Sequence, residues 1–153
     1  MDVYEKMKEL KLTLPKTPAK GGVYAPAKRF GQGLVYVSGC GPALNEAVCG
    51  RLGREFGVEE GKIFAQNCML NILSVLENEI GDLRKVKNVV KILTFVQCTE
   101  DFHEQPAVAN GGSQLLLDLF GRAAGLPSRS AIGTNSLPGN IPVETEALFE
   151  VDI

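Results

Sequence analysis

The sequence predicts an α+β fold, a mixed β-sheet with two helices packed on one of its faces. From Phe64 to Ile80 an apolar residue recurs every four positions, the pattern of a helix that buries one broad face. Val86 to Val96 is almost continuously apolar, as expected for a central strand. From Val143 to Val151 apolar residues alternate with mostly acidic ones, which indicates a strand with one buried face. Because two helices cover only one face of such a sheet, neighbouring subunits of an oligomer could cover the other.

The segment before the sheet is predicted to be a short amphipathic helix over residues 2–10, since its apolar residues recur at helical spacing. Residues 19–26 contain two glycines and a proline, so they are expected to form a loop. That loop presents one conspicuous side chain, Tyr24. We expect a single domain over residues 1–153, in which residues 1–18 are an N-terminal helical extension and linker.

The first strand is expected over residues 30–38, which are rich in β-branched and aromatic side chains. Residues 39–42 then turn the chain. A weaker returning strand is expected over residues 50–54, so that the first two strands would form a hairpin. The long helix follows over residues 59–80, with Gly81 placed as its C-terminal cap.

The second half of the chain is predicted to contain a central strand, a helix and two further strands. The helix could begin with a capping box formed by Asp101 and Glu104, or with Pro106 as its first residue. The last two strands are separated by a segment with turn composition and are expected to form a hairpin. They cover residues 130–134 and 143–151.

The composition is that of an ordinary globular protein, with 44% hydrophobic and 22% charged residues in a chain of 153. The formal net charge of -2 argues against a general nucleic-acid binder, because such binding depends on clustered lysine and arginine. The N-terminus lacks the apolar core of a signal peptide, and no window approaches the roughly 18 apolar residues of a spanning helix. We therefore expect a cytoplasmic protein without nucleic-acid or membrane partners.

The residues that commonly bind metals are sparse. The cysteines are scattered without a Cys-x-x-Cys pair, and His103 is the only histidine, so we expect free thiols and no metal site. Cys68 follows the helical apolar pattern and is expected in the core. Cys40 lies between two glycines and could line a pocket. No phosphate-binding loop or nucleophile elbow is present, and no cofactor is expected.

Arg129 is the first candidate for chemistry. It follows a proline corner at the start of a strand, where a rigidly held guanidinium could offer two parallel donors to a carboxylate. The alternative is an ion pair with Glu144 or Glu146 of the strand that we expect beside it. The spacing of these residues leaves both interpretations open.

Two other side chains could complete a site with Arg129. Glu144 alternates with apolar residues, so it is either an exposed strand residue or a buried carboxylate able to activate water. Tyr24 could close over a pocket from its glycine-rich loop, or serve packing alone. His103 is interpreted as a surface or capping group. The glycines at 39 and at 111–112 could allow close approach of a ligand, or simply tight packing.

Several blocks of sequence carry a family resemblance. Near the C-terminus these are Pro127–Ile132, Leu137–Pro138 and Val143–Ala147, and upstream they are Tyr24, Val35–Gly39, Lys91–Val96, Asp101–Phe102 and Asn110. With these residues in this order, nearly the whole chain resembles the Rid family, the reactive intermediate deaminases, also called the YjgF/YER057c/UK114 family. The N-terminal extension and the longer segment over residues 41–59 point to a divergent subgroup.

The resemblance implies a chorismate-mutase-like fold and a homotrimer with three pockets at subunit interfaces. It implies hydrolysis of small 2-imino or 2-enamino acids, such as 2-aminoacrylate, to 2-keto acids and ammonia. By the same resemblance Arg129 would hold the substrate carboxylate, Glu144 would position the attacking water, and Tyr24 would close the pocket. The other substrate-binding positions implied are Ser38, Gly39, Cys40, Asn110 and Ala131.

The chain departs from the family pattern at positions that bear on activity. Ala131 stands where cysteine or threonine is frequent, and Cys40 stands where glutamine is common. A second hypothesis is therefore a regulatory trimer that binds a small carboxylate such as a 2-keto acid without turning it over. A third is a structural trimer with a vestigial pocket. Some relatives are described as ribonucleases, and the acidic composition gives that activity little support.

Overall fold

The helical pattern that ends at Ile80 belongs to the longest helix, α2 (Val58–Ile80), in a computed structural model that describes residues 1–153. The N–H of Gly57 donates to the Glu60 carboxylate at 3.1 Å, which satisfies one backbone donor at the helix start. Gly81 ends the helix with a φ of 84°, a left-handed conformation that glycine adopts at little cost. The predicted cap at Gly81 is thus confirmed.

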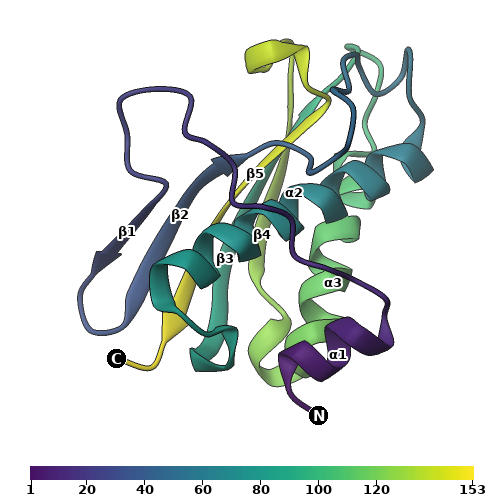
Figure 1. Ribbon diagram of the computed structural model, residues 1–153. Coiled ribbons are helices and arrows are strands. Elements are labelled where there is room, and N and C mark those ends of the chain that lie inside the picture. The colour runs from purple at the N-terminus through teal and green to yellow at the C-terminus, as the bar shows by residue number, and fades with distance from the viewer.

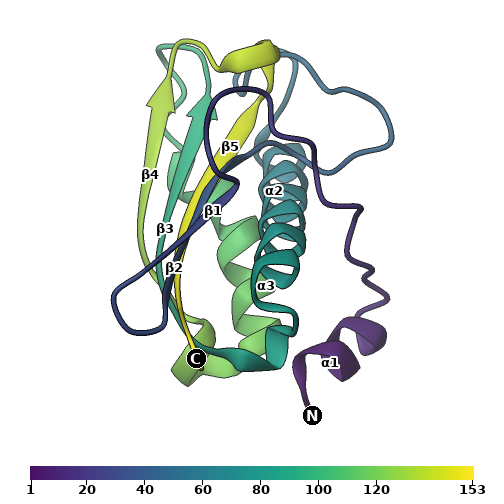
Figure 2. The ribbon, with the colours of Figure 1, turned by 60° about the vertical axis from the view of Figure 1, so that its left-hand side comes forward.

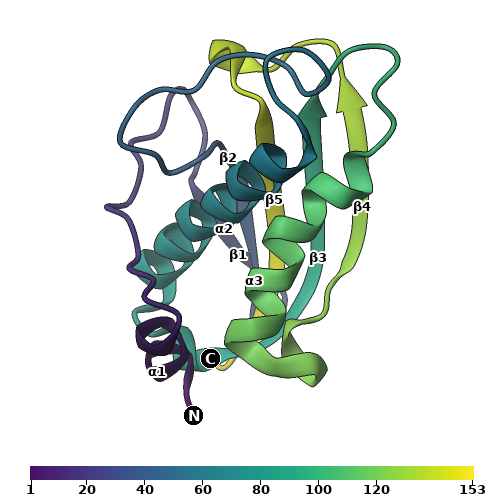
Figure 3. The same cartoon turned by 90° about the vertical axis from the view of Figure 1, so that its right-hand side faces the viewer.

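The second long helix, α3 (Gln105–Gly125), has no capping box and carries Pro106 in its first turn, as its second residue. Of the two predicted starts the proline start is therefore the one observed, with the helix beginning one residue before Pro106. α3 lies beside α2 (Figure 3). A side chain at Gly111 would collide with the backbone of Lys62 in α2, so this glycine serves helix packing. No helix of the protein is both long enough and apolar enough to cross a bilayer.

Five strands form one sheet in the order β1-β2-β5-β3-β4. β3 and β4 run parallel, and every other neighbouring pair is antiparallel. Figures 1 and 2 show α2 and α3 on the same side of this sheet. The predicted fold class, a mixed sheet with two helices on one face, is therefore confirmed. The strands are β1 (Ala27–Phe30), β2 (Leu34–Cys40), β3 (Val86–Gln97), β4 (Ser128–Thr134) and β5 (Val143–Val151).

Both predicted hairpins are wrong in their placement. β4 and β5 are not neighbours, because β3 lies between them and pairs with both. Residues 50–54 form no strand, and Leu52 makes only isolated bridges to Phe56 and Cys98. The N-terminal hairpin instead joins β1 to β2 across Gly31 and Gly33, which both have positive φ.

The alternation along each strand gives the sheet a helix-facing side and an open side. Ala147 and Phe149 are 1% and 0% exposed and belong to the main core cluster with residues of α2 and α3. Tyr36 and Glu146 lie on the open side, where the Tyr36 hydroxyl donates to Glu146 Oε1 at 2.9 Å. No helix covers this side (Figure 2).

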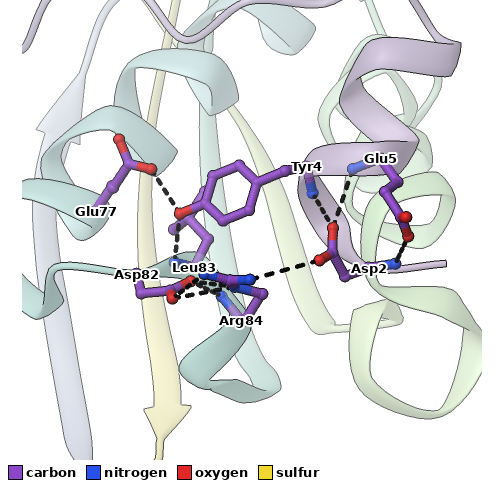
Figure 4. Close-up of polar contacts among 7 residues, drawn as sticks. All are labelled: Asp2, Tyr4, Glu5, Glu77, Asp82, Leu83 and Arg84. Atoms are coloured by element: carbon purple, nitrogen blue, oxygen red, sulfur yellow. Dashed lines mark hydrogen bonds and ion pairs between the residues drawn. The ribbon is translucent and has the colours of Figure 1, made fainter.

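The N-terminal helix, α1 (Val3–Glu9), is fixed to the end of α2 by the phenol of Tyr4. Its hydroxyl donates to Glu77 Oε1 at 2.6 Å and accepts the N–H of Leu83 at 2.9 Å (Figure 4). Burial and the bond to Glu77 raise the pKa of Tyr4 to about 12, so the hydroxyl stays protonated. Asp2 caps the helix and also approaches Arg84 at 3.8 Å.

Residues 11–20, which we call the strap, lead from α1 across α2 towards β1 (Figure 1). The Ser74 hydroxyl of α2 donates to the carbonyl of Pro15 at 2.8 Å and lies 3.1 Å from the Thr17 hydroxyl. The strap is therefore tied to the long helix by side-chain hydrogen bonds at its middle.

Replacing Tyr4 by phenylalanine is expected to lower the free energy of unfolding by about 1–2 kcal/mol, because Glu77 and the Leu83 N–H lose their shared partner. Urea denaturation of the Tyr4→Phe variant measures this change. Tyr24→Phe is the matched control, since its hydroxyl contacts only the exposed N–H of Gly21. Equal losses in the two variants would show that the Tyr4 hydroxyl does not fix α1.

Candidate functional site

A pocket of about 180 Å³ lies between the strap, the Tyr24 loop and the end of β2. It is smaller than the roughly 300–1,000 Å³ of pockets for drug-sized ligands, which suits a metabolite of a few carbon atoms. We call it the Tyr24 pocket. Its lining includes four residues predicted from the sequence, namely Tyr24, Ser38, Gly39 and Cys40.

Hydrogen bonds fix the loop that carries Tyr24 against β2. The Ser38 hydroxyl donates to the carbonyl of Ala25 at 2.7 Å, and the Ser38 N–H donates to the carbonyl of Pro26 at 2.9 Å. The N–H of Gly21 donates to the Tyr24 hydroxyl at 3.1 Å. Ser38 therefore acts on the pocket through the loop that it holds in place.

Glu144 lies on the open side of the sheet, directly against Gly39. A Cβ added to Gly39 would lie 2.5 Å from Glu144 Oε1, so only glycine leaves room for this carboxylate. Burial raises the pKa of Glu144, and repulsion from Glu146 on the same strand raises it further. A carboxylate with a raised pKa is a better proton acceptor when it is ionised, as a water-activating group must be.

Cys40 lines the Tyr24 pocket as an un-ionised thiol. Burial raises its pKa to about 11, and the nearby charge of Glu144 adds to the shift. Since the thiolate is the reactive form, this cysteine is a poor nucleophile at neutral pH. Cys68, predicted in the core, is fully buried, and burial likewise raises its pKa.

Arg129 lies on β4 at the edge of the sheet and contacts α3. Its Nη1 donates to Asn110 Oδ1 at 2.7 Å and to the Ser113 hydroxyl at 3.1 Å. Its Nε and Nη2 make no hydrogen bond within the chain, and no carboxylate pairs with it. The guanidinium is thus oriented by neutral partners and retains donors for an incoming anion. We call Arg129, Asn110 and Ala131 the Arg129 edge.

The alternative ion pair of Arg129 with Glu144 or Glu146 is wrong, because it assumed that β4 and β5 are adjacent. β3 separates them, which places their backbones at least about 9 Å apart. The guanidinium also has neutral partners on α3, which the sequence could not indicate without the tertiary fold.

Glu144 and the Arg129 edge face opposite sides of the sheet. Arg129 of β4 pairs with Ile92 of β3, and Ile92 pairs in turn with Ala147 of β5. Ile92 and Ala147 are buried under the helices, so Arg129 projects to that side as well. Glu144 is three residues from Ala147 and therefore projects to the open side. One chain does not bring the guanidinium and the carboxylate together.

A larger hollow lies elsewhere on the surface. It measures about 540 Å³ and runs between the end of α1 and the flanks of α2 and α3. Of the residues singled out from the sequence it contains only Asn110 and Gly111, so we place the candidate chemistry at the smaller pocket. His103 is exposed and lines neither hollow.

Sequence reasoning missed Lys20 and Asn71, which also line the Tyr24 pocket. Asn71 occurs within an apolar helical pattern, where a polar residue on the buried face was the available signal. Lys20 belongs to the loop already singled out for Tyr24, but nothing in its neighbours marks it.

Comparison with known proteins assigns this architecture. A family profile described as "YjgF/chorismate mutase-like, putative endoribonuclease" matches residues 5–148. The chain is 37% identical to Protein TCP17 of Trypanosoma cruzi, over 95% of this chain and 92% of that protein. It is 28% identical to a 2-iminobutanoate/2-iminopropanoate deaminase of Dermatophagoides farinae, over 92% of this chain and 95% of that protein.

The solved structures agree with the sequence relatives. The crystal structure of Atu1372 from Agrobacterium tumefaciens, a protein of unknown function, superposes with a TM-score of 0.90 at 37% identity. The superposition covers 98% of this chain and 92% of that one. The fold is thus that of the chorismate-mutase-like α+β proteins. The chain belongs to the YjgF/Rid family, as the blocks of sequence around Arg129 and Glu144 indicated.

Proposed function

We propose that the protein hydrolyses small 2-imino and 2-enamino acids to 2-keto acids and ammonia, in clefts shared by the subunits of a homotrimer. One observation carries the proposal. Arg129 has free donors for an anion and Glu144 has a raised pKa, yet the two side chains face opposite sides of one sheet. A second copy, packed against the open side, could supply the missing half. The relative named as a deaminase supports the same reaction class.

In such a cleft the reaction needs only binding and proton transfer. Arg129 of one subunit would hold the substrate carboxylate through its free donors. Glu144 of the neighbour would accept a proton from water as the water oxygen bonds to C2 and the C=N π electrons move to nitrogen. Glu144 would pass this proton to nitrogen, which gives a carbinolamine. It would then move the hydroxyl proton to the same nitrogen, so that the C–N bond breaks, the C=O bond forms and ammonia leaves. Tyr24 would close the cleft from its loop.

The test is ammonia release from 2-aminoacrylate or 2-iminopropanoate generated in situ by a second enzyme. The protein should increase the rate in proportion to its concentration. Equal rates with and without it would overturn the proposed hydrolysis. Calorimetric binding of a 2-keto acid without turnover would then select the regulatory trimer in place of the enzyme.

Replacing Gly39 by alanine is expected to lower kcat/KM by about ten- to a hundredfold, because the new methyl group displaces the Glu144 carboxylate. The melting temperature should stay near that of the unaltered protein, since the end of a flexible side chain can move. Gly21→Ala is the control, because a Cβ there meets nothing within 4 Å. Full activity in Gly39→Ala would show that the position of Glu144 does not matter.

As the pH is lowered, the activity should be lost at a higher pH than it would be if the proton acceptor were a glutamate with an ordinary pKa. Protonation removes the proton acceptor, and burial together with Glu146 raises the pKa of Glu144. Glu146→Gln removes the like charge, so it should shift the acid limb of kcat/KM to lower pH. Glu150→Gln, on the same strand beside Lys87, serves as control. If the acid limb of the kcat/KM profile lies at the same pH in Glu146→Gln as in the unaltered protein, Glu144 is not the titrating group.

A further inference from the structure

The strap forms one wall of the Tyr24 pocket through Pro18, Ala19 and Lys20. Its middle is hydrogen-bonded to Ser74, so this wall has a defined position over α2. Lys20 takes part in none of the ion pairs within the chain. The strap thus adds to the lining of the pocket a lysine that no carboxylate of the chain neutralises.

The floor of the same pocket holds a polar group without a partner. Asn71 is 9% exposed, and its Nδ2 donates to the carbonyl of Gly41 at 2.9 Å, which fixes the orientation of the amide. No donor in the chain reaches its Oδ1. Every fully buried side-chain oxygen or nitrogen of the protein has a hydrogen-bond partner. Since Asn71 Oδ1 has none, it is not fully buried, and it is open to the pocket that Asn71 lines. A nearly buried acceptor of this kind suits an N–H group of a ligand.

A cation in the wall and an acceptor on the floor match a ligand with a carboxylate at one end and an N–H group at the other. In the proposed reaction the substrate's first carboxylate is held by Arg129, and its imine nitrogen carries the N–H. The carboxylate facing Lys20 must then be a second one. We infer that Lys20 and Asn71 form a specificity subsite for imines of dicarboxylic 2-amino acids, an inference that rests on the proposed function.

The experiment compares kcat/KM for two imines generated in situ, one from a dicarboxylic and one from a monocarboxylic amino acid, by the matching amino-acid oxidases. The protein should prefer the dicarboxylic imine, and Lys20→Met should reduce that preference about fivefold. Lys16→Met removes the same charge from the strap at a position outside the pocket and should retain the preference. No preference, or equal changes in both variants, would overturn the subsite.

Binding of stable 2-keto acids separates this inference from the proposed function. By calorimetry, 2-oxoglutarate should bind more tightly than 2-oxobutanoate, and Lys20→Met should remove most of the difference. If this holds while neither imine is turned over, the subsite stands and the proposed hydrolysis fails. If imines are hydrolysed without such a difference in binding or in kcat/KM, the hydrolysis stands and the subsite fails.

Discussion

The Arg129→Ala variant is expected to hydrolyse 2-iminopropanoate with kcat/KM lowered by about two to three orders of magnitude. The reason is the loss of a charge-assisted, two-point grip on the substrate carboxylate, which costs about 2–5 kcal/mol when one partner of such a pair is removed. Arg129→Lys keeps the charge but not the planar fork, so it should recover only part of the activity. The ammonia-release assay measures kcat/KM for the unaltered protein, Arg129→Ala and Arg129→Lys under the same conditions.

A matched control separates this effect from a general loss of positive charge. Arg122 lies on the exposed side of α3 and makes no ion pair, so Arg122→Ala should retain the activity. A thermal melt of each variant checks that Asn110 and Ser113, which lose their donor in Arg129→Ala, do not unfold the edge of the sheet. If Arg129→Ala folds and keeps full activity, the guanidinium does not bind the substrate.

Local patterns in the sequence identified the two long helices and the strands β2 to β5, but not β1 or how distant strands pair. The period of α2 and its end at Gly81 follow from side-chain spacing and backbone conformation, and both are local properties. The insertion of β5 between β2 and β3 depends instead on long-range packing, including the burial of Phe149. A short segment such as residues 130–134 is compatible with parallel or antiparallel pairing, so the expected final hairpin was wrong.

The candidate site shows the same division. Tyr24, Ser38, Gly39 and Cys40 lie close together because one loop and one strand end carry them. The side of the sheet to which Arg129 projects is a consequence of register with Ile92, and the residue pattern of a short edge strand does not specify it. The roles of these residues in catalysis remain predictions that the variants described above test.

The second large effect concerns the sharing of each site between two chains. Glu144→Gln keeps the shape of the side chain but removes the proton acceptor, and it should lower kcat by about a hundredfold or more. Arg129→Ala and Glu144→Gln are then each nearly inactive alone. When the two variants are mixed by refolding together, some clefts combine the intact Arg129 of one chain with the intact Glu144 of another. Random assembly should restore activity at about a quarter of the clefts.

This recovery is possible only if each cleft takes its arginine and its glutamate from different subunits, as their projection to opposite sides of one sheet requires. The control is a double variant that carries both substitutions, refolded with either single variant. Neither of these mixtures contains both intact groups, so neither should gain activity. If the mixture of single variants is no more active than its components, although mass measurements show mixed assemblies, the two groups do not act in one shared cleft. Because each single variant is nearly inactive, both groups would then have to act from the same chain, and the bare side of the sheet would need a different explanation.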